Sequence, residues 1–262
     1  DKGKSHASGK VLYGARIIPY RGSWLDFEFD AKDLVYVRID RRRKLFASIL
    51  LKALGFSNQE ILQEFYETET FKIKSNNTYQ LELIPKRLMG KITPIDISNR
   101  GEVIVKKGER ISARHIRKIE SAKIKHLVYE EDSMDSLVLA KDIFDKTTGE
   151  VLLPCNTPLN EEILSTIQSL GLKELETLYI NDLESGPYMA DTLRADSTTN
   201  EIEALVEIYR MMRPGEPPTK DAATTLFKSL FFNPERYDLS NVGRMKFNKR
   251  LGRNSIEGNS VL

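Results

Sequence analysis

Only one cysteine, Cys155, occurs among the 262 residues, so an intrachain disulfide cannot form. A single thiol is typical of proteins from a reducing compartment, and we expect a cytoplasmic location. No stretch approaches the 18 or more uncharged apolar residues that a membrane-spanning helix needs, so we expect no membrane partner. The net charge is only +2, from 40 Lys and Arg against 38 Asp and Glu, so the chain as a whole is not a polycation.

The motifs of common catalytic and nucleotide-binding sites are also missing. The three histidines, His6, His115 and His126, show no metal-ligand spacing, and one cysteine cannot complete a zinc site with them. No GxxxxGK[ST] or GxGxxG loop, no GxSxG elbow and no SxxK pair is present. Cys155 is expected to be a buried or loop thiol rather than a nucleophile. We therefore predict that this chain carries no catalytic residue, no cofactor and no metal site.

The balance of charge differs between the middle of the chain and its ends. Residues 1–67 and 193–262 together carry 23 basic and 18 acidic residues, whereas residues 68–192 carry 17 basic and 20 acidic ones. Such a split indicates that the middle segment has a different role from the flanking arms. We predict an inserted domain over 68–192 between two arms, and we expect the arms rather than the insertion to face a polyanion.

Both arms combine strand and helix patterns. Trp24, Phe27 and Phe29 fall close to a period of two, with acidic residues between them, which is typical of a strand with one solvated face. The patterns predict strands over 11–18, 24–30 and 35–40, and helices over 45–54, 202–212 and from Thr219 to Asn233. We expect the α+β class, with both arms packed as one discontinuous lobe domain of short strands and helices.

The middle segment contains an internal repeat with an offset of 48 residues. Residues 101–105, Gly-Glu-Val-Ile-Val, align without gaps on residues 149–153, Gly-Glu-Val-Leu-Leu. Aliphatic positions continue to match along both copies, as a shared core requires. The matching pairs include Ile111 with Leu159, Ile116 with Leu164, and Ile119 with Ile167.

Each copy is typical of a β-turn-β unit followed by a short helix. Ser112 caps the predicted helix in the first copy, and Asn160 caps it in the second. Two copies are too few for a solenoid. We therefore predict an inserted α/β unit made of two repeated β-β-α modules, at about 91–128 and 139–176.

One basic run and the only tryptophan give the sharpest functional signal. Residues 41–44, Arg-Arg-Arg-Lys, follow a predicted strand that already carries Arg38 and Asp40. One interpretation makes the run a solvated corner and Trp24 a core residue. The other makes Trp24 a partly exposed ring on the same face as Arg41, where it stacks an unpaired base while cations neutralise phosphates. Spacing alone leaves both interpretations open.

Four segments resemble the bacterial DNA-directed RNA polymerase beta subunit. They are ARIIPYRGSWLDFE at 15–28, VRIDRRRK at 37–44, YRMMRPGEPP at 209–218, and RYDLSNVGRMKFN at 236–248. The segments lie in both arms, and the middle segment resembles the lineage-specific insertion of proteobacterial-type beta subunits. One position differs, because Phe46 stands where the family usually has proline. The resemblance covers essentially the whole chain but only part of the subunit, so we expect a fragment of a longer chain.

The resemblance implies a non-catalytic part of a nucleotidyltransferase. The fragment looks like the second lobe of the beta pincer, which lines the DNA cleft and contacts downstream duplex DNA and the non-template strand. Its partners in the family are the beta-prime, alpha and sigma subunits, and the catalytic Mg²⁺ is held by beta-prime. By matching motif positions, Trp24 corresponds to a tryptophan that stacks on a non-template base. Asp40 and Arg41 match polar residues of the same path, and Arg213 and Arg236 match basic residues facing the separated strand.

A second function belongs to a different class. The chain is then chiefly a protein-docking module, and the acidic insertion binds a transcription regulator. The two functions are compatible, because the arms and the insertion can divide the work between them.

Overall fold

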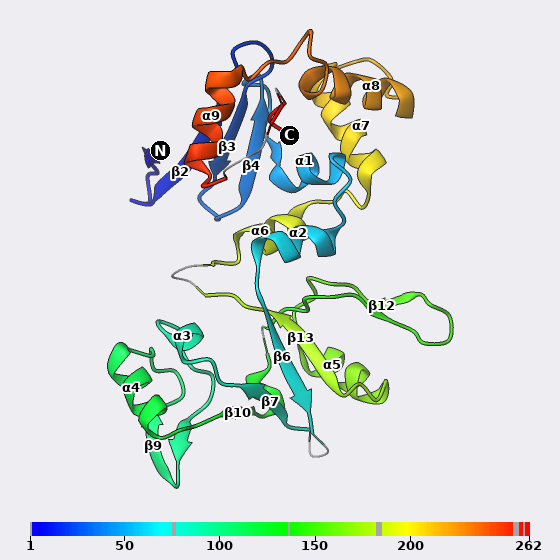
Figure 1. Cartoon of the computed structure of the whole chain (residues 1–262). Helices are drawn as coiled ribbons and strands as arrows, with labels where there is room; N and C mark the ends of the chain where they lie inside the picture. Colours follow the sequence, from blue (N-terminus) through cyan, green and yellow to red (C-terminus); the bar gives the residue numbers. More distant parts are fainter. Residues whose placement is uncertain (1, 75–76, 136, 182–184, 254–256, 259) are drawn as a thin grey trace. The chain divides into compact units, whose positions relative to one another are not determined.

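The chain forms two compact units. The computed structural model describes residues 2–74, 77–135, 137–181, 185–253, 257–258 and 260–262 (Figure 1). Unit 1 consists of Asp1–Ser57 together with Tyr188–Leu262, and unit 2 consists of Asn58–Pro187. The described residues form short strands in antiparallel sheets and nine α-helices, so the α+β class is confirmed.

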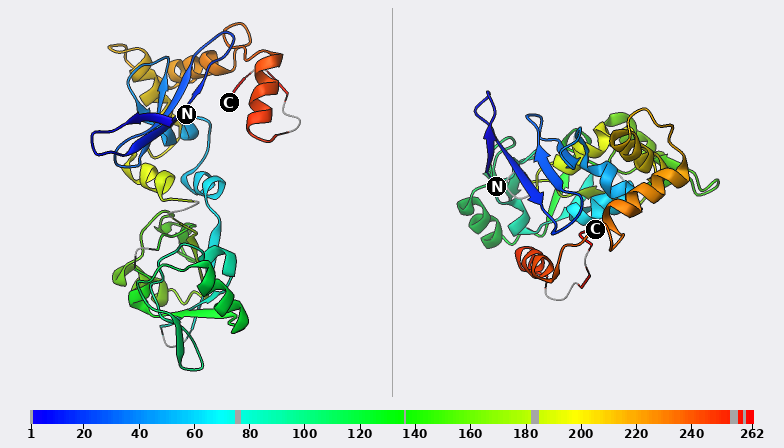
Figure 2. Two further views of the ribbon diagram at one scale, coloured as in Figure 1. Left: turned by 90° about the vertical axis from the view of Figure 1, so that its left-hand side faces the viewer. Right: turned by 90° about the horizontal axis from the view of Figure 1, so that it is seen from above.

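Unit 1 contains a five-stranded antiparallel sheet. In spatial order its strands are β1 (Lys2–Ser5), β2 (Val11–Ile17), β3 (Leu25–Phe29), β4 (Val35–Ile39) and β5 (Leu45–Phe46). Leu25 and Ile39 are paired across β3 and β4, and both are fully buried, so this face of the sheet covers the core. Figure 2 shows the β1–β2 ribbon at the outer edge of the sheet.

The helices of unit 1 include three, over residues 47–53, 201–212 and 220–231, whose buried side chains pack with the apolar face of this sheet. Asn200 and Thr219 cap two of them, each by accepting a hydrogen bond from the backbone N–H three residues later. Both predicted helices of the second arm are therefore confirmed. The helices are α1 (Ala47–Ala53), α6 (Tyr188–Ala195), α7 (Glu201–Met212), α8 (Lys220–Phe231) and α9 (Asn241–Arg250).

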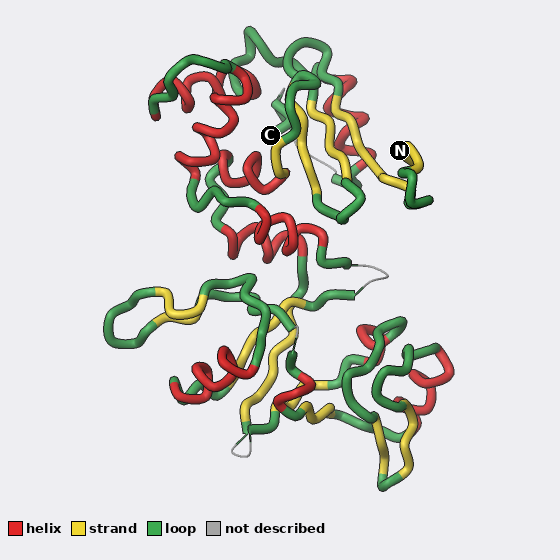
Figure 3. The backbone as a smooth tube through the Cα atoms, turned by 180° about the vertical axis from the view of Figure 1, so that it is seen from behind, coloured by secondary structure: helices red, strands yellow, loops and turns green. Residues whose placement is uncertain are grey.

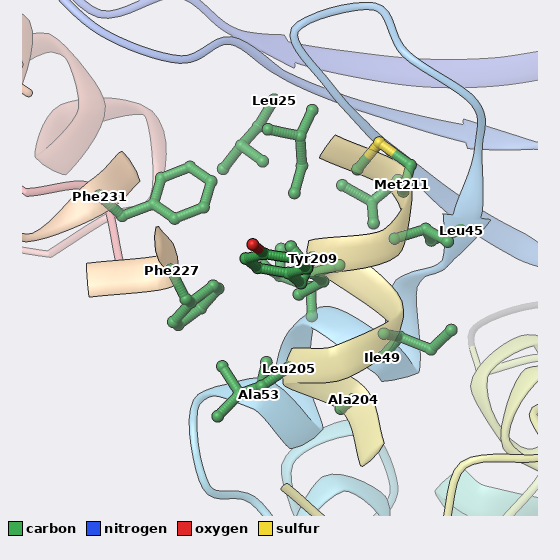
Figure 4. Packing of buried hydrophobic residues seen from close by; sticks show 14 of the residues in the cluster. Leu25, Leu45, Ile49, Ala53, Ala204, Leu205, Tyr209, Met211, Phe227 and Phe231 are labelled. Atoms are coloured by element: carbon green, nitrogen blue, oxygen red, sulfur yellow. The ribbon is translucent and has the colours of Figure 1, made fainter. Parts of the chain in front are cut away.

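Helix α7 lies at the centre of the unit 1 core. Figure 4 shows Leu205 and Tyr209 of α7 among Leu25 of the sheet and Phe227 and Phe231 of α8. Because α7 follows the inserted segment while the sheet precedes it, burial of these side chains joins the two arms. Apolar burial of this kind contributes about 25 cal/mol per Å², the dominant favourable term in folding.

A buried polar cluster also joins the two arms. The Lys52 ammonium of α1 donates to Asp196 Oδ2 at 2.9 Å and to the Thr198 carbonyl at 2.6 Å. The Asp196 carboxylate also accepts from Ser48 Oγ at 2.7 Å and from the backbone N–H and hydroxyl of Thr198. Burial by itself raises the pKa of Asp196, but these hydrogen bonds outweigh it and hold the pKa below its ordinary value.

Unit 2 is built around a four-stranded antiparallel sheet. Its strand order is β10 (His126–Tyr129), β7 (Tyr79–Glu82), β6 (Thr68–Ile73) and β13 (Glu174–Leu178). The remaining elements are α2 (Asn58–Phe65), α3 (Pro85–Leu88), β8 (Ile97–Asn99), β9 (Glu102–Val105), α4 (Ala113–Ser121), the 3₁₀ turn η1 (Glu131–Ser133), β11 (Ile143–Phe144), β12 (Val151–Leu153) and α5 (Glu161–Ser169).

The predicted repeat is present as two structurally equivalent modules. Each module has a hairpin, β8–β9 or β11–β12, then a helix, α4 or α5, then a strand that pairs with one side of the central β6–β7 pair. Figures 1 and 3 show the two hairpin-and-helix groups on either side of this sheet. Ser112 and Asn160 cap α4 and α5 as predicted.

The aligned aliphatic residues occupy equivalent core positions. Ile111 and Leu159 are each 1% exposed, and Ile119 and Ile167 are fully buried, as the alignment predicts. In the third pair Leu164 is buried, whereas Ile116 is only partly buried. One hydrogen bond at the open end of each hairpin repeats as well. The Lys107 N–H donates to Asp96 across β8–β9, and the Cys155 N–H donates to Asp142 across β11–β12, both at 2.6 Å.

The boundaries of the inserted unit differ from the sequence-based ones at 67/68 and 192/193. Helix α2, placed with the first arm, belongs to unit 2, where Gln59 Oε1 accepts a hydrogen bond from the Asp142 N–H at 3.1 Å. Helix α6 belongs to unit 1 from its first residue. There Thr192 accepts from the Val35 N–H at 2.9 Å.

Phe46, at the position where the related family usually has proline, has a defined role here. It pairs with Tyr36 across β4 and β5, and the two rings stack with centroids 5.0 Å apart. Phe46 is the residue just before α1. The helix begins at Ala47, two residues later than the predicted start at Leu45. The helix end is as predicted, because Gly55 follows the C-cap residue with φ +97°.

Candidate nucleic-acid interface

Two consecutive residues with positive φ form a tight turn after β4. Asp40 has φ +50° and Arg41 has φ +57°, and the Arg42 N–H donates to the Ile39 carbonyl at 3.0 Å. These are the features of a type I′ turn, which normally takes Asn, Asp or Gly at its two central positions. The left-handed conformation costs an arginine about 1–2 kcal/mol, so other interactions must stabilise the backbone at Arg41.

The Asp40 carboxylate fixes the backbone at Trp24. One oxygen accepts from the Trp24 N–H and the other from Ser23 Oγ, both at 2.8 Å. In return, the Asp40 N–H donates to the Trp24 carbonyl at 3.0 Å. Because both carboxylate oxygens are engaged, Asp40 acts here as a clip between the turn and the segment that carries the indole.

Two guanidinium groups lie against the Trp24 ring. The ring is half-buried, with Arg41 Cζ at 4.6 Å and Arg16 Cζ at 5.7 Å from its centroid. Both distances are within the range of a cation–π interaction. Of the two interpretations, the structure therefore agrees with a partly exposed ring beside Arg41, and Trp24 is not part of the unit 1 core.

The two arginines differ in how firmly they are held. Arg16 forms an ion pair with Asp26, which is buried on the polar face of β3 rather than solvated. Among the described residues, Arg41 forms no ion pair. Arg16 is thus fixed beside the indole, whereas the Arg41 side chain is free to exchange partners.

Trp24 lies on the opposite side of the strand from the one its spacing suggests. β3 begins at Leu25, and Leu25 and Phe27 contact the core, so Trp24 is in phase with Asp26 rather than with Phe27 and Phe29. The approximate period of two did not show on which face Trp24 lies, because a shift of one residue moves a side chain to the other face of a strand.

The segment that carries Arg236 lies against the turn before Trp24. Arg21 and Asp238 exchange backbone hydrogen bonds at 3.1 and 2.8 Å. Gly22, at φ +118°, is so close that a Cβ there would lie 2.9 Å from the Arg236 carbonyl oxygen and 2.7 Å from the Tyr237 ring. The exposed Arg236 guanidinium donates to Ser229 Oγ at 2.9 Å.

Arg213 lies in a separate cluster at the end of α7. Its guanidinium donates to Glu216 at 3.2 Å, and the Tyr209 hydroxyl donates to the same carboxylate oxygen at 2.9 Å. These two hydrogen bonds lower the pKa of Glu216. No contact within the described ranges joins Arg213 to Trp24, so the structure brings together Trp24, Asp40 and Arg41 but not Arg213.

No constellation for metal or thiol chemistry is evident in the part of the chain that the structure describes. No three His, Cys, Asp or Glu side chains lie close enough there to hold a metal ion. Cys155 is buried, and burial together with the nearby Asp142 raises the pKa of its thiol to about 12, which disfavours the reactive thiolate. None of the helices in the described residues is long and apolar enough to cross a membrane.

Comparison with known families shows what the chain as a whole is similar to. The family model described as RNA polymerase Rpb2, domain 2, matches residues 2–144 and 102–261. The chain belongs to this family. The two matches overlap at 102–144 and together include both arms and the insertion. The Rpb2 domain 2 family forms a lobe of the second-largest subunit of RNA polymerase, which is a nucleotidyltransferase complex.

Proposed function

We propose that this Rpb2 domain is the DNA-contacting lobe of a bacterial RNA polymerase beta subunit, and that Trp24 stacks on an unpaired base of the non-template strand. The observation that carries the proposal is the half-buried indole with a fixed and a free guanidinium beside it. A flat ring flanked by cations is the usual platform for a single-stranded nucleic acid, because every base has a π-face and every nucleotide has a phosphate.

The residues around the ring have different roles in this proposal. A base replaces the Arg41 guanidinium on the ring, and Arg41 then neutralises a neighbouring phosphate. The exchange is favourable because base stacking contributes about 1–3 kcal/mol, whereas an exposed cation–π contact contributes about 0.5–1 kcal/mol. Asp40 is a positioning residue in this proposal, since its carboxylate binds the Trp24 N–H and the Ser23 hydroxyl rather than the DNA strand.

Arg213 and Arg236 extend the proposed surface beyond Trp24. Both guanidinium groups are exposed; Arg213 contacts Glu216, and Arg236 contacts Ser229. We assign them to phosphate contacts with the separated strand or the downstream duplex, where they add affinity without sequence preference. The chemistry of nucleotide addition belongs to other parts of the assembled enzyme, including the Mg²⁺ that we expect beta-prime to hold. The alpha and sigma subunits remain partners of the whole enzyme in this proposal.

The test is the lifetime of the open promoter complex in the assembled polymerase. Trp24→Ala should shorten it by about 5- to 150-fold, the equivalent of losing 1–3 kcal/mol of stacking. Trp24→Phe retains a π-face and should recover most of the lifetime. Nucleotide addition on a preformed elongation scaffold should change little in either variant.

Tyr13→Ala is the matched control, because Tyr13 is another exposed ring of unit 1 for which no cation contact is found among the described residues. Its loss should leave the open-complex lifetime unchanged. Arg41→Gln should reduce the salt dependence of the lifetime by about one phosphate contact without altering promoter preference. An unchanged lifetime in Trp24→Ala would refute the stacking role.

A further inference from the structure

The two modules of unit 2 share a fold but carry opposite charge. Residues 91–128 contain ten Lys and Arg against four Asp and Glu, whereas residues 139–176 contain three against seven. The net charges are thus +6 and −4. A weakly acidic insertion is therefore divided into one strongly basic and one acidic module. Because the two backbones are equivalent, this difference does not follow from the fold.

The basic module has a groove between its hairpin and its helix. The groove has a volume of about 550 Å³ and lies between β8–β9 and α4. Arg114, Arg117 and Lys118 line it from α4, at the spacing that places side chains on one helix face. The other lining residues are Asn99, Glu102, Ile104, Ser121 and Ala122. Figure 3 shows the hairpin and α4 side by side.

The cations of this groove are open to solvent. Arg114, Arg117 and Lys118 are all exposed, and none forms an ion pair with any described residue. Glu102 is the only carboxylate that lines the groove. Three like charges on one helix face repel one another, and such an arrangement is unfavourable for a helix unless an anion neutralises it.

We propose that this groove binds the phosphate backbone of duplex nucleic acid. Arginine, lysine, serine and asparagine side chains are the usual phosphate ligands, and these line the groove. An acidic protein would need an apolar interface core as well, but only Ile104 and Ala122 supply apolar lining. The inference goes beyond the function proposed above, because it concerns residues of unit 2 alone and does not depend on Trp24.

The acidic module provides an internal comparison. At the offset of 48 residues, Arg114, Arg117 and Lys118 correspond to Glu162, Ser165 and Thr166. The same groove position in the second copy therefore carries one anion and no cation. Phosphate binding is expected in the first module and not in the second, although the backbone scaffold is the same in both.

The experiment measures binding of a short fluorescein-labelled DNA duplex to the full 262-residue chain by anisotropy, across a salt series. All variants keep unit 1 unchanged, so that its contribution, including any from Arg213 and Arg236, is the same in each and cancels in the comparison of slopes. Changing Arg114, Arg117 and Lys118 together to Gln should lower the slope of log K against log salt by about 2.7. Raising the salt concentration from about 50 to about 200 mM should then weaken DNA binding by the chain with the intact groove about 40-fold more than DNA binding by the variant.

Two further variants keep the test independent of net charge and of folding. Changing Lys141, Lys146 and Lys173 of the acidic module together to Gln alters the net charge by the same amount and should leave the slope almost unchanged. Combining Glu162→Arg with Ser165→Arg and Thr166→Lys rebuilds the cations on the second scaffold and should strengthen binding. Of these positions, Thr166 is half-buried and all the others are exposed.

Equal slopes for the groove variant and the Lys141, Lys146 and Lys173 variant would overturn the proposal, because net charge alone would then explain binding. Competition by poly-glutamate as effective as that by unlabelled duplex, at equal charge, would also overturn it and would assign the groove to acidic proteins. The assignment to nucleic acid is supported if the groove variant lowers the salt slope more than the Lys141, Lys146 and Lys173 variant does, and if poly-glutamate does not displace the duplex.

Discussion

The buried Lys52–Asp196 pair should be one of the most sensitive points in unit 1. The two side chains are 2% and 1% exposed, and they come from α1 and from the segment after α6. Removing one partner of a buried ion pair leaves the other charge unpaired and typically costs about 3–5 kcal/mol. Domains are stable by only about 5–15 kcal/mol, so either Lys52→Met or Asp196→Asn should remove a large part of the stability of unit 1.

The measurement is urea unfolding followed by tryptophan fluorescence. Trp24 is the only tryptophan and lies in unit 1, so the signal reports this unit alone. The double variant should cost no more than either single one, because no unpaired charge remains. Arg210→Met is the control: its exposed ion pair with Glu207, at 2.7 Å, should contribute less than about 1 kcal/mol. The reasoning would be refuted if Lys52→Met and Asp196→Asn each lowered the free energy of unfolding no more than Arg210→Met does.

The pair also predicts a pH dependence with a defined sign. The pKa of Asp196 is depressed in the folded state, so its contribution is present above the unfolded pKa of about 3.9 and is lost as pH falls through the lower, folded pKa. In Lys52→Met a strong pKa-lowering hydrogen bond is gone, and burial then raises the pKa of Asp196. The cost of Lys52→Met should therefore be greatest near pH 7 and smaller below pH 4. A cost that grows on acidification would contradict this assignment.

Three other predictions concern single positions. Gly22→Ala should lower the urea midpoint of unit 1 more than Gly55→Ala does, because both have positive φ but only Gly22 lacks room for a Cβ. Ile119→Ala and Ile167→Ala should each cost about 2–5 kcal/mol in unit 2 by circular dichroism, and a large difference between them would contradict their equivalence. Cys155 should react with iodoacetamide at pH 8 only after unfolding, since its thiol pKa is about 12; rapid labelling of the native chain would refute this.

Sequence reasoning succeeded where the signal is local. The caps at Ser112, Asn160 and Thr219 were predictable because each depends on a side chain and a backbone N–H three residues apart, whereas the equivalent cap at Asn200 was not predicted. The repeat was predictable because equivalent core positions must keep equivalent aliphatic side chains. The α+β class followed from the alternation of strand and helix patterns in the arms.

Strands β6 and β7 show what the sequence did not indicate. They form the centre of the unit 2 sheet, yet each is short, and their partners β10 and β13 lie far along the chain. The two strands pair with each other, but the other edge of each is completed by a strand of a module, β10 on β7 and β13 on β6. Local pattern carries no information about such partners.

At the candidate interface, the residue types were visible in the sequence but their arrangement was not. The sequence supplied Trp24, Asp40 and Arg41, and it left open whether the indole was in the core. The register of β2 against β3 decides that Arg16 and Asp26 pair beside the ring. A strand register is set by the packing of the whole sheet on its core, so a shift of one residue would move these side chains to the opposite face.

Charge follows the same division between sequence and structure. The sequence determined how many cations each module has, but only the tertiary structure showed that Arg114, Arg117 and Lys118 share a groove and have no partner among the described residues. It likewise paired Lys52 with Asp196 across 144 positions of sequence. Coulombic interactions depend on distance in space, and in this chain that distance is set by how the arms and the modules pack.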